Sequence, residues 1–294
     1  MRTIAYYPGC SLHGTAREYD ISVKEVCREL DLELKEVEDW NCCGATSAHS
    51  LNQKLAYLLP ARNLKIIEES GLDVVIPCAA CFSRIHACAY ALKNDQDKKL
   101  ELEQELNFRF KNKTKIYHLS ELLLNEVGLD KIRAQIKFSL AGLTFVCYYG
   151  CLLVRPHEIT GFDDKENPLI LDELVQALGA ASLDWPYKTE CCGASLSLSK
   201  PVLVNKLVDK MVSWAREAEA DAIITACPLC QANLEMRQTK GNNIPVFYFS
   251  EVLGLAFGLK NIEPLFSQHI VDPGSLLDDW RRAKKMNKNI NSHV

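Results

Sequence analysis

The chain has 294 residues, enough for two domains of ordinary size, and its 48% hydrophobic and 24% charged residues are typical of a globular protein in water. The formal net charge of −4 gives no basic surface for nucleic acid, so we expect no nucleic-acid partner. The N-terminus lacks the apolar run of a signal peptide, and polar residues interrupt the longest uncharged stretch, residues 138–154. We therefore expect a cytoplasmic protein without a transmembrane segment.

Apolar runs and amphipathic segments alternate along the first half of the sequence. Short β-branched runs predict strands, and apolar residues at helical spacing predict helices between them. Pro60 is expected to kink the helix in which it lies, and Gly71 to end that helix. The predicted strands are residues 3–7, 32–37, 73–77 and the start of 117–123, and the predicted helices are residues 16–30, 51–70, a segment after Cys78, 98–113 and the end of 117–123.

The second half repeats this order, and its residues 246–253 match the segment around Ser120 and Glu121. Alternating strands and helices predict parallel α/β units with right-handed crossovers. We therefore expect an α/β fold with two tandem, internally duplicated, Rossmann-like domains at residues 1–140 and 141–270. A basic C-terminal tail is expected at residues 271–294. The predicted strands of the second half are residues 143–148, 181–184 and 221–226, and its predicted helices are 170–178 and 201–219.

Two cysteine motifs occur once in each half. A Cys-Cys-Gly-Ala motif begins at Cys42 and again at Cys191, and a Cys-x-x-Cys motif begins at Cys78 and again at Cys227, both at an offset of 149 positions. A lone cysteine preceded by glycine leads each copy. The first set is Cys10, Cys42, Cys43, Cys78 and Cys81, and the second is Cys151, Cys191, Cys192, Cys227 and Cys230.

Each of these cysteine motifs follows a predicted strand. In a parallel sheet the C-terminal ends of the strands lie at one edge, which is where ligands bind. Cysteines that are distant in sequence are therefore expected to converge at that edge, giving one metal site in each domain. Thirteen cysteines in a compartment that keeps thiols reduced also favour metal binding or redox chemistry over structural disulfides.

Five thiols in each site favour an iron–sulfur cluster. A zinc ion takes four ligands, and an ordinary 4Fe–4S cluster also takes four thiolates. Adjacent cysteines can share or bridge iron atoms, and soft thiolates suit an unusual iron–sulfur cluster better than zinc. Structural zinc in each half and reversible dithiol pairs stay open as alternatives. Cys27, Cys88 and Cys147 are not expected to be ligands.

This duplicated pattern of a lone Cys, a Cys-Cys-Gly and a Cys-x-x-Cys resembles the CCG-domain family, and in particular the B subunit of heterodisulfide reductase with its bacterial and archaeal relatives. The resemblance covers roughly residues 3–273. It implies that the ten cysteines of the two sets hold two 4Fe–4S clusters of the non-cubane type, one in each CCG domain. It also implies a cavity between the domains, faced by both clusters, in which a disulfide is cleaved.

The resemblance implies a catalytic subunit that reduces a disulfide to two thiols, or that runs the reverse oxidation of thiols or sulfane sulfur. The implied partners are a ferredoxin-like C subunit and a flavin-bearing A subunit. No Gly-x-Gly-x-x-Gly follows a strand, so we expect neither a flavin nor a nucleotide on this chain. The alternative is an electron-relay subunit of another oxidoreductase complex, without a disulfide substrate of its own.

Charged residues close to the cysteines are candidates for binding an anionic substrate or for delivering protons, because thiolates and sulfides make a cluster site negative. The methanogen-type subunit tends to have a histidine on each side of Tyr-Gly-Cys, whereas this chain has Tyr148 and Leu152 at these two positions. The disulfide or thiol is therefore not identified. The charged candidates are Arg84, His86, Arg155 and His157, together with His13 and His49.

Overall fold

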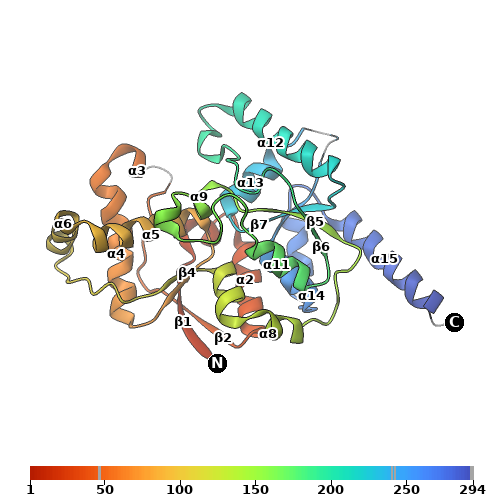
Figure 1. Ribbon diagram of the computed structural model, residues 1–294, viewed down its shortest axis with the longest axis horizontal. Helices are drawn as coiled ribbons and strands as arrows, with labels where there is room; N and C mark the ends of the chain where they lie inside the picture. Colours follow the sequence, from red (N-terminus) through yellow and green to blue (C-terminus); the bar gives the residue numbers. More distant parts are fainter. Residues whose placement is uncertain (46–47, 240, 242, 292–294) are drawn as a thin grey trace.

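The computed structural model describes residues 1–45, 48–239, 241 and 243–291, and within them it contains two four-stranded sheets (Figure 1). The strand orders are β2-β1-β3-β4 and β6-β5-β7-β8, and all neighbouring strands run parallel. The predicted α/β fold with two duplicated parallel-sheet units is therefore confirmed. The strands are β1 (Arg2–Tyr6), β2 (Leu32–Glu36), β3 (Val74–Ile76), β4 (Ile116–His118), β5 (Thr144–Tyr148), β6 (Ala181–Leu183), β7 (Ala222–Thr225) and β8 (Val246–Tyr248).

Position within the sheet explains the composition of the strands. β3 and β7 have a neighbouring strand on each side and are buried at every residue, as expected for the continuous apolar runs of a parallel sheet. β2 lies at the edge of its sheet, and its charged residues Glu33 and Lys35 are exposed. The central strands therefore form the interior of each sheet.

Most of the longer helices lie close to the predicted segments, but the helices at residues 228–236 and 274–291 were not predicted. α4 (Gln53–Ser70) begins after Asn52, whose side chain accepts the Leu55 N–H at 3.0 Å, and it ends at Gly71, whose φ is 71°. Pro60 lies inside this helix. The other helices of eight or more residues are α2 (Arg17–Glu29), α5 (Ala79–Asn94), α6 (Gln96–Leu106), α11 (Ile170–Ala177), α12 (Pro201–Glu217), α13 (Pro228–Met236), α14 (Phe249–Ala256) and α15 (Gly274–Asn291). The shorter ones are α1 (Gly9–His13), α3 (Ala48–Leu51), α7 (Leu119–Glu121), η1 (Leu122–Val127), α8 (Leu129–Ala134), α9 (Cys151–Val154), α10 (His157–Thr160), η2 (Ala194–Leu196) and η3 (Glu263–Gln268).

The predicted helix at residues 98–113 is wrong beyond the end of α6. Asn107 has a left-handed backbone, with φ 46°, and this conformation ends the helix. The chain that follows is held by Glu68, whose carboxylate accepts the N–H groups of Lys111 and Asn112 at 2.9 and 2.7 Å. A side chain on another helix therefore fixes this loop, and the local sequence does not reveal it.

The two halves of the chain pack into each other. Figure 1 shows α2 of the first half beside α14 of the second, where the hydroxyl oxygens of Ser22 and Ser250 are 2.6 Å apart. α5 likewise contacts α9 and α10 of the second half. One hydrophobic cluster contains buried residues from both halves. The domain boundaries near residues 140 and 270 stay a prediction.

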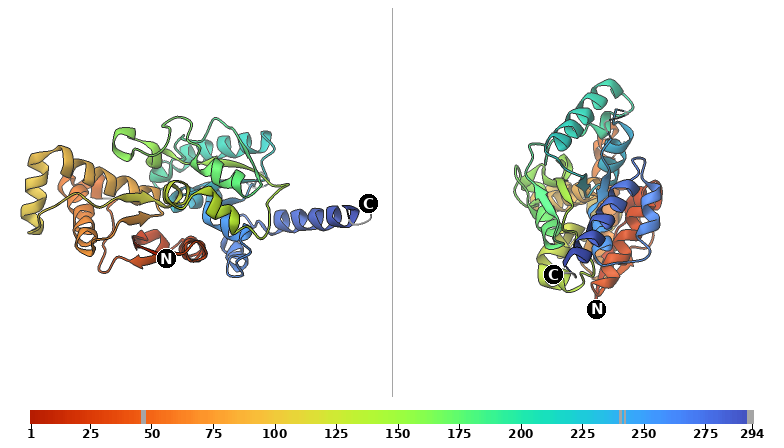
Figure 2. Two further views of the ribbon diagram at one scale, coloured as in Figure 1. Left: turned by 60° about the horizontal axis from the view of Figure 1, so that its bottom comes forward. Right: turned by 90° about the vertical axis from the view of Figure 1, so that its right-hand side faces the viewer.

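The C-terminal helix α15 projects from the body of the molecule (Figure 2). Leu277 and Trp280 anchor its first part in the hydrophobic core, and Trp280 Nε1 donates to the Ala141 carbonyl at 3.0 Å. Further along the helix, Arg281 forms an ion pair with Glu263. No helix in the described ranges is both long and apolar enough to span a bilayer.

Candidate metal centre

The first set of cysteines lies at the C-terminal ends of three strands of the first sheet. Cys10 stands in α1, after β1, and Cys42 and Cys43 lie in the loop after β2. Cys78 follows β3 and precedes α5, whose first turn contains Cys81. The parallel topology therefore brings these five residues to one sheet edge, and we call them the first thiol set.

The second set of cysteines repeats this arrangement on the second sheet. Cys151 begins α9 after β5, and Cys191 and Cys192 lie in the loop after β6. Cys227 follows β7 and precedes α13, which contains Cys230. These five residues form the second thiol set.

Sulfur atoms within each thiol set lie close together. Cys43 Sγ is 3.3 Å from Cys81 Sγ, and Cys192 Sγ is 3.9 Å from Cys230 Sγ. The two pairs are equivalent, since each joins the second cysteine of Cys-Cys to the last cysteine of Cys-x-x-Cys. Sulfur atoms at this spacing are placed to bind one polynuclear group.

Backbone N–H groups also point at sulfur. The N–H of Gly44 donates to Cys42 Sγ at 3.4 Å, and the N–H of Gly193 donates to Cys191 Sγ at 3.3 Å. Both glycines have φ 80°, a left-handed conformation that residues with a Cβ rarely adopt. Glycine after each Cys-Cys therefore turns an N–H donor toward the first sulfur of the pair, and this hydrogen bond by itself lowers the pKa of that thiol.

Two further glycines leave room beside the last cysteine of each set. A Cβ added to Gly9 would lie 2.7 Å from Cys81 Sγ, and a Cβ added to Gly150 would lie 3.2 Å from Cys230 Sγ. Both glycines also have positive φ, 71° and 70°. The backbone before each lone cysteine therefore approaches sulfur more closely than a side chain allows.

Two tyrosines that the sequence analysis did not single out hold the Cys-Cys loops. Tyr7 donates its hydroxyl to the Asn41 carbonyl at 2.7 Å, and Tyr148 donates to the Glu190 carbonyl at 2.7 Å. Each carbonyl belongs to the residue before Cys-Cys. The signal in the sequence is a tyrosine three residues before the lone cysteine in both copies.

Hydrogen bonds between thiols lower the pKa of one cysteine in each set. Hydrogen bonds with Cys42 and Cys81 lower the pKa of Cys43 to about 4, and a hydrogen bond with Cys151 lowers the pKa of Cys191 to about 6. Each set thus contains one cysteine whose thiolate form is favoured by a neighbouring thiol. Because metals bind the deprotonated form of cysteine, these thiolates prepare the sets for a metal group.

The two thiol sets meet at Cys78 and Cys227. Each of these thiols shifts the pKa of the other, and each residue is 2% exposed. The outer sides of the sets are open, since Cys10, Cys42 and Cys191 are exposed. The two sites therefore form one joined centre, buried at its middle and accessible at both ends.

The two candidate arginines have different neighbours. Arg84 on α5 is half-buried, and its charge adds to the hydrogen bond from Cys42 in lowering the pKa of Cys43. Arg155 forms an ion pair with Glu166 at 3.2 Å. Arg84 is thus the one whose charge acts on a thiol of the first set.

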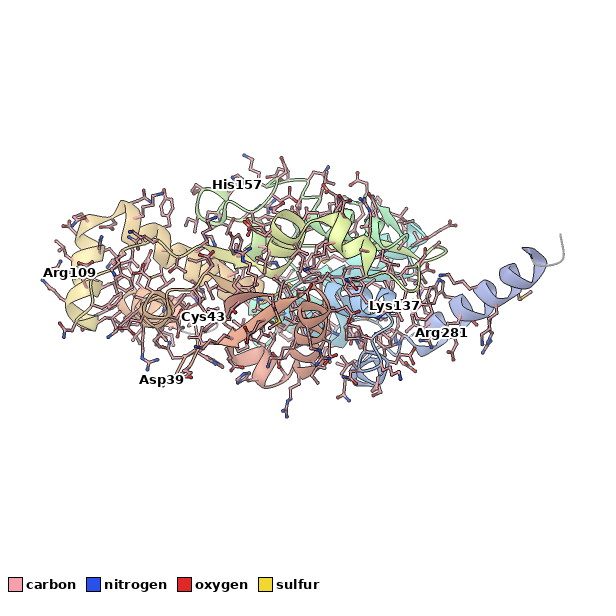
Figure 3. The ribbon with its side chains drawn as sticks, turned by 90° about the horizontal axis from the view of Figure 1, so that it is seen from below. Asp39, Cys43, Arg109, Lys137, His157 and Arg281 are labelled. Atoms are coloured by element: carbon pink, nitrogen blue, oxygen red, sulfur yellow. The ribbon has the colours of Figure 1, made fainter. Side chains whose placement is uncertain are left out.

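Two candidate histidines hydrogen-bond to backbone. His86 Nε2 lies 3.2 Å from the Ile116 carbonyl, and burial lowers the pKa of His86. His157 Nε2 lies 2.9 Å from the Asp163 carbonyl. In Figure 3, His157 lies at the outer edge of the molecule and Cys43 toward its middle.

The remaining two histidines lie near the Cys-Cys loop of the first half. His13 Nε2 lies 2.8 Å from Glu36 Oε1, and the His13 ring packs on Trp40 with centroids 5.0 Å apart. His49 is exposed, with its Nε2 3.4 Å from the Ser50 hydroxyl. Both side chains have polar partners outside the thiol sets.

The other three cysteines lie in the hydrophobic core. Cys27, Cys88 and Cys147 are each 0% exposed, and burial raises the pKa of Cys27 and of Cys88 to about 12. Such thiols stay protonated and are poor metal ligands. Their environment agrees with the expectation that they are not ligands.

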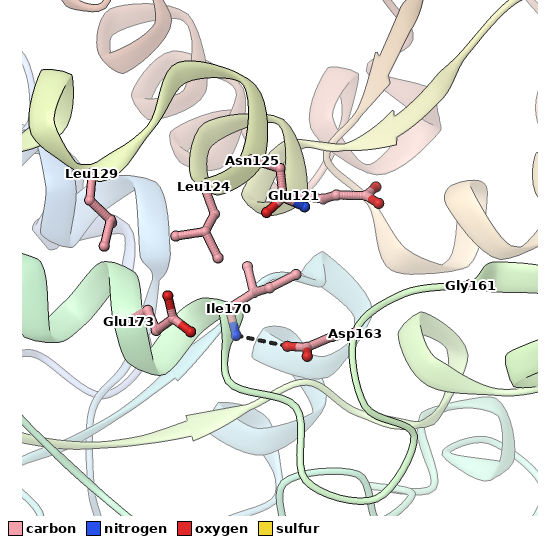
Figure 4. Close-up of a pocket in the computed structure, with 8 residues that line it drawn as sticks. All are labelled: Glu121, Leu124, Asn125, Leu129, Gly161, Asp163, Ile170 and Glu173. Atoms are coloured by element: carbon pink, nitrogen blue, oxygen red, sulfur yellow. Dashed lines mark hydrogen bonds between the residues drawn. The ribbon is translucent and has the colours of Figure 1, made fainter.

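A cavity of about 520 Å³ lies apart from the thiol sets, between η1, α8 and α11 (Figure 4). Its polar lining includes Glu121, Asn125, Asp163 and Glu173, and the Asp163 carboxylate accepts the Ile170 N–H at 2.8 Å. No cysteine lines this cavity. It is therefore separate from the candidate metal centre.

The donor atoms of the thiol sets fit polynuclear groups. Among the described residues, no group of three or more His, Cys, Asp or Glu side chains is already arranged to hold a metal ion. Each set offers five cysteine sulfurs, a close sulfur pair, an N–H directed at sulfur and a glycine that leaves space. An iron–sulfur cluster, with several metal ions and soft ligands, uses such a donor set.

Comparison with other proteins supports this interpretation. The cysteine-rich (CCG) domain model matches residues 4–86 and 145–235. The 8-methylmenaquinol:fumarate reductase membrane anchor subunit of Wolinella succinogenes is 27% identical over 94% of this chain and 99% of its own length. The B subunit of the ferredoxin/F(420)H(2)-dependent CoB-CoM heterodisulfide reductase of Methanosarcina acetivorans is 27% identical over 92% of this chain and 94% of its own. A protein of Archaeoglobus profundus, described as like the B subunit of heterodisulfide reductase, is 28% identical over 85% and 89%.

A solved structure shares the fold at low identity. The crystal structure of a hypothetical protein from Helicobacter pylori has a TM-score of 0.70 and 10% identity, and the match covers 92% of this chain and 52% of that one. The two segments that match the CCG domain span more than half of the sequence, and each contains a complete thiol set. The chain therefore belongs to the cysteine-rich CCG-domain family and is related to the B subunit of heterodisulfide reductase.

Proposed function

We propose that the chain is an iron–sulfur subunit of an oxidoreductase complex that reduces a disulfide to two thiols, or runs the reverse oxidation. The observation that carries this proposal is the closeness of the two Cys-x-x-Cys loops: the Tyr19 hydroxyl oxygen lies 3.0 Å from the carbonyl oxygen before Cys78 and 3.4 Å from the one before Cys227, so two metal sites there would be adjacent. Disulfide reduction takes two electrons, and iron–sulfur clusters pass electrons one at a time. Two adjacent sites therefore suit the reaction better than one.

Each thiol set would hold one 4Fe–4S cluster. Five cysteines are one more than an ordinary cluster uses, and the resemblance to the B subunit of heterodisulfide reductase implies the non-cubane type. A cluster bound there would supply one-electron redox chemistry and affinity for sulfur. Tyr7 and Tyr148 hold the Cys-Cys loops in place, and Arg84 offsets negative charge at the first set. The proposed ligands are Cys10, Cys42, Cys43, Cys78, Cys81, Cys151, Cys191, Cys192, Cys227 and Cys230.

The reaction consumes one disulfide, two electrons and two protons and releases two thiols. A ferredoxin-like C subunit would deliver the electrons singly, and a flavin-bearing A subunit would supply that ferredoxin-like partner. The exposed sides of Cys10, Cys42 and Cys191 offer access from outside. We propose Arg84 and Arg155 as groups that bind an anionic substrate, with His86 and His157 as further candidates for proton delivery.

A second function is an electron relay without a disulfide substrate. It is favoured by the relative from Wolinella succinogenes, whose name describes part of a fumarate reductase and no disulfide. The buried contact between the sites suits electron passage equally well. The two functions differ in whether thiols bind at the centre.

The test is metal analysis of anaerobically purified protein, followed by electron paramagnetic resonance after addition of thiols. We expect about eight irons per chain, matched by acid-labile sulfide, and a paramagnetic signal that appears only with thiol. Cys42→Ser should lower the iron content to about half, because one of two clusters is lost. Cys88→Ser, at a buried cysteine outside the sets, is the matched control and should keep full iron.

Other outcomes separate the alternatives. Full iron without a response to a panel of thiols, including coenzyme M and coenzyme B, would favour the relay. Two zinc ions and no iron would contradict both redox functions and would indicate a structural zinc protein.

A further inference from the structure

Two buried side chains connect the Cys-x-x-Cys loops of the two halves. The Tyr19 hydroxyl oxygen lies 3.0 Å from the Pro77 carbonyl oxygen and 3.4 Å from that of Ala226. His118 Nε2 lies 2.9 Å from the Pro77 carbonyl oxygen. Each of these carbonyl groups belongs to the residue directly before a Cys-x-x-Cys. The four groups therefore join the loops just before their first cysteines.

Tyr19 and His118 each have one proton to donate to the carbonyl oxygens. Tyr19 and His118 are each 0% exposed, so water does not compete for their polar atoms. His118 Nδ1 accepts the Ser120 N–H at 3.2 Å, which places the ring proton of the neutral imidazole on Nε2. The tyrosine O–H and the histidine Nε2–H are thus two donors facing two carbonyl oxygens. Without Tyr19 the Ala226 carbonyl loses this donor, and without His118 the Pro77 carbonyl loses one of its two donors.

The junction lies where the duplicated segments face each other. His118 and Tyr248 occupy equivalent positions, each directly before a helix whose third residue is Glu. The Tyr19 ring stacks on Tyr248, with centroids 4.1 Å apart and planes at 3°, and the His118 ring meets Phe162 edge-on at 5.8 Å. Rings contributed by the second half therefore fix the orientation of both donors.

We propose that Tyr19 and His118 are positioning residues that hold the two Cys-x-x-Cys loops at a fixed separation, so that the two thiol sets act as one two-electron centre. The proposed two-electron role rests on the proposed function, whereas the fixed separation of the two loops does not. The hydrogen bonds of both side chains at this junction go to backbone carbonyls. Their effect on Cys78 and Cys227 is therefore transmitted through the peptide groups that precede these cysteines.

The first test is hydrogen exchange measured by mass spectrometry on the iron-loaded chain. In Tyr19→Phe, which keeps the ring on Tyr248, we expect amides of both Cys-x-x-Cys loops to exchange about five-fold faster, the effect of one hydrogen bond. His118→Leu should accelerate exchange mainly in the first of these loops, where His118 contacts the Pro77 carbonyl. His118→Gln keeps an N–H donor near the position of Nε2 and should restore exchange close to wild type.

The matched control is Tyr6→Phe. Tyr6 on β1 is as buried as Tyr19. Its hydroxyl donates to Asp20, the residue after Tyr19 on α2, at 2.7 Å and does not reach either loop. Its substitution should leave exchange in both loops unchanged. Equal acceleration in Tyr6→Phe, or acceleration of one loop only in Tyr19→Phe, would overturn the clamp.

The second test is electron paramagnetic resonance of the same samples at equal iron content. Reduced wild type should show magnetic interaction between the two sites, and Tyr19→Phe and His118→Leu should lose it. An unchanged interaction in these variants would overturn the proposed coupling. Absence of iron from wild type would instead refute the proposed function, and the metal analysis would reveal it before any variant is compared.

Discussion

At the scale of single residues, the centre depends on space as much as on sulfur. Gly9 has φ 71°, and a Cβ there would lie 2.7 Å from Cys81 Sγ. Gly71 has the same φ, but a Cβ there meets nothing within 4 Å. The two glycines thus separate the cost of a left-handed backbone from the cost of a clash with a ligand.

We predict that Gly9→Ala reduces the iron content to about half, because the new methyl group displaces a ligand of the first set only. Gly71→Ala should keep full iron and lose about 1 to 2 kcal/mol of unfolding free energy, the cost of placing a Cβ at this backbone conformation. Iron analysis and urea denaturation of both variants make the comparison. Full iron in Gly9→Ala would show that the backbone shifts to accept the methyl group.

The sequence predicts the identity of the thiols better than their surroundings. The repetition of the cysteine motifs at a constant offset, and their placement after predicted strands, can be recognised from the sequence alone. The roles of Tyr7 and Tyr148 depend on carbonyl groups more than thirty residues away. Tyr19 and His118 meet carbonyls from both halves, and no local pattern predicts such a contact.

At the scale of elements, a buried charged network ties the end of α13 to the start of α14. His269 lies between two carboxylates, with Nδ1 2.9 Å from Glu235 and Nε2 3.1 Å from Glu251. The three side chains are at most 1% exposed. Burial opposes the charged imidazolium, but hydrogen bonds with both glutamates outweigh it and raise the pKa of His269 to about 10.

This network predicts a pH-dependent contribution to stability. Because the folded-state pKa of His269 lies above its ordinary value of 6.5, its contribution is complete below pH 6.5 and is lost as the pH rises through about 10. At neutral pH, His269→Gln should lower the unfolding free energy by roughly 3 to 5 kcal/mol, because two buried carboxylates lose their cation. The difference from wild type should shrink toward pH 10.

Urea denaturation across this pH range checks the prediction, with His86→Gln as a control of opposite sign. Burial lowers the pKa of His86, so its contribution is lost as the pH falls below 6.5. A difference between wild type and His269→Gln that stays constant up to pH 10 would show that His269 is neutral in the folded chain.

The duplicated segment around this network shows where prediction from sequence ends. Glu121 and Glu251 match in the two copies, and each accepts the N–H at the start of its helix. Glu251 has His269 as a partner, whereas Glu121 faces the cavity of Figure 4, where burial raises its pKa to about 7. The repeat was visible in the sequence, but the different partners were not, because His269 lies beyond the repeated segment.

At the scale of the whole molecule, the two halves share an interior. Phe162 of the second half is 0% exposed and meets Phe82 and His118 of the first half, with ring centroids 6.3 and 5.8 Å apart. The alternation of strands and helices predicts two sheets, but it does not predict how the helices of one half cover the other. Such packing depends on contacts between residues far apart in sequence.

We predict from this packing that the halves unfold in one transition. Phe162→Ala should lower the unfolding free energy by roughly 3 to 5 kcal/mol, because it opens a cavity between the halves. Pulsed hydrogen exchange during urea denaturation reports unfolding of each half through peptides from β3 and β7. In Phe162→Ala, the urea concentration at half-unfolding should fall by the same amount for both peptides. Leu198→Ala, at a residue 97% exposed, is the control and should change stability by less than about 0.5 kcal/mol. A shift of the β7 peptide alone would mean that the halves unfold independently, and the joined centre would then form between two separately stable units.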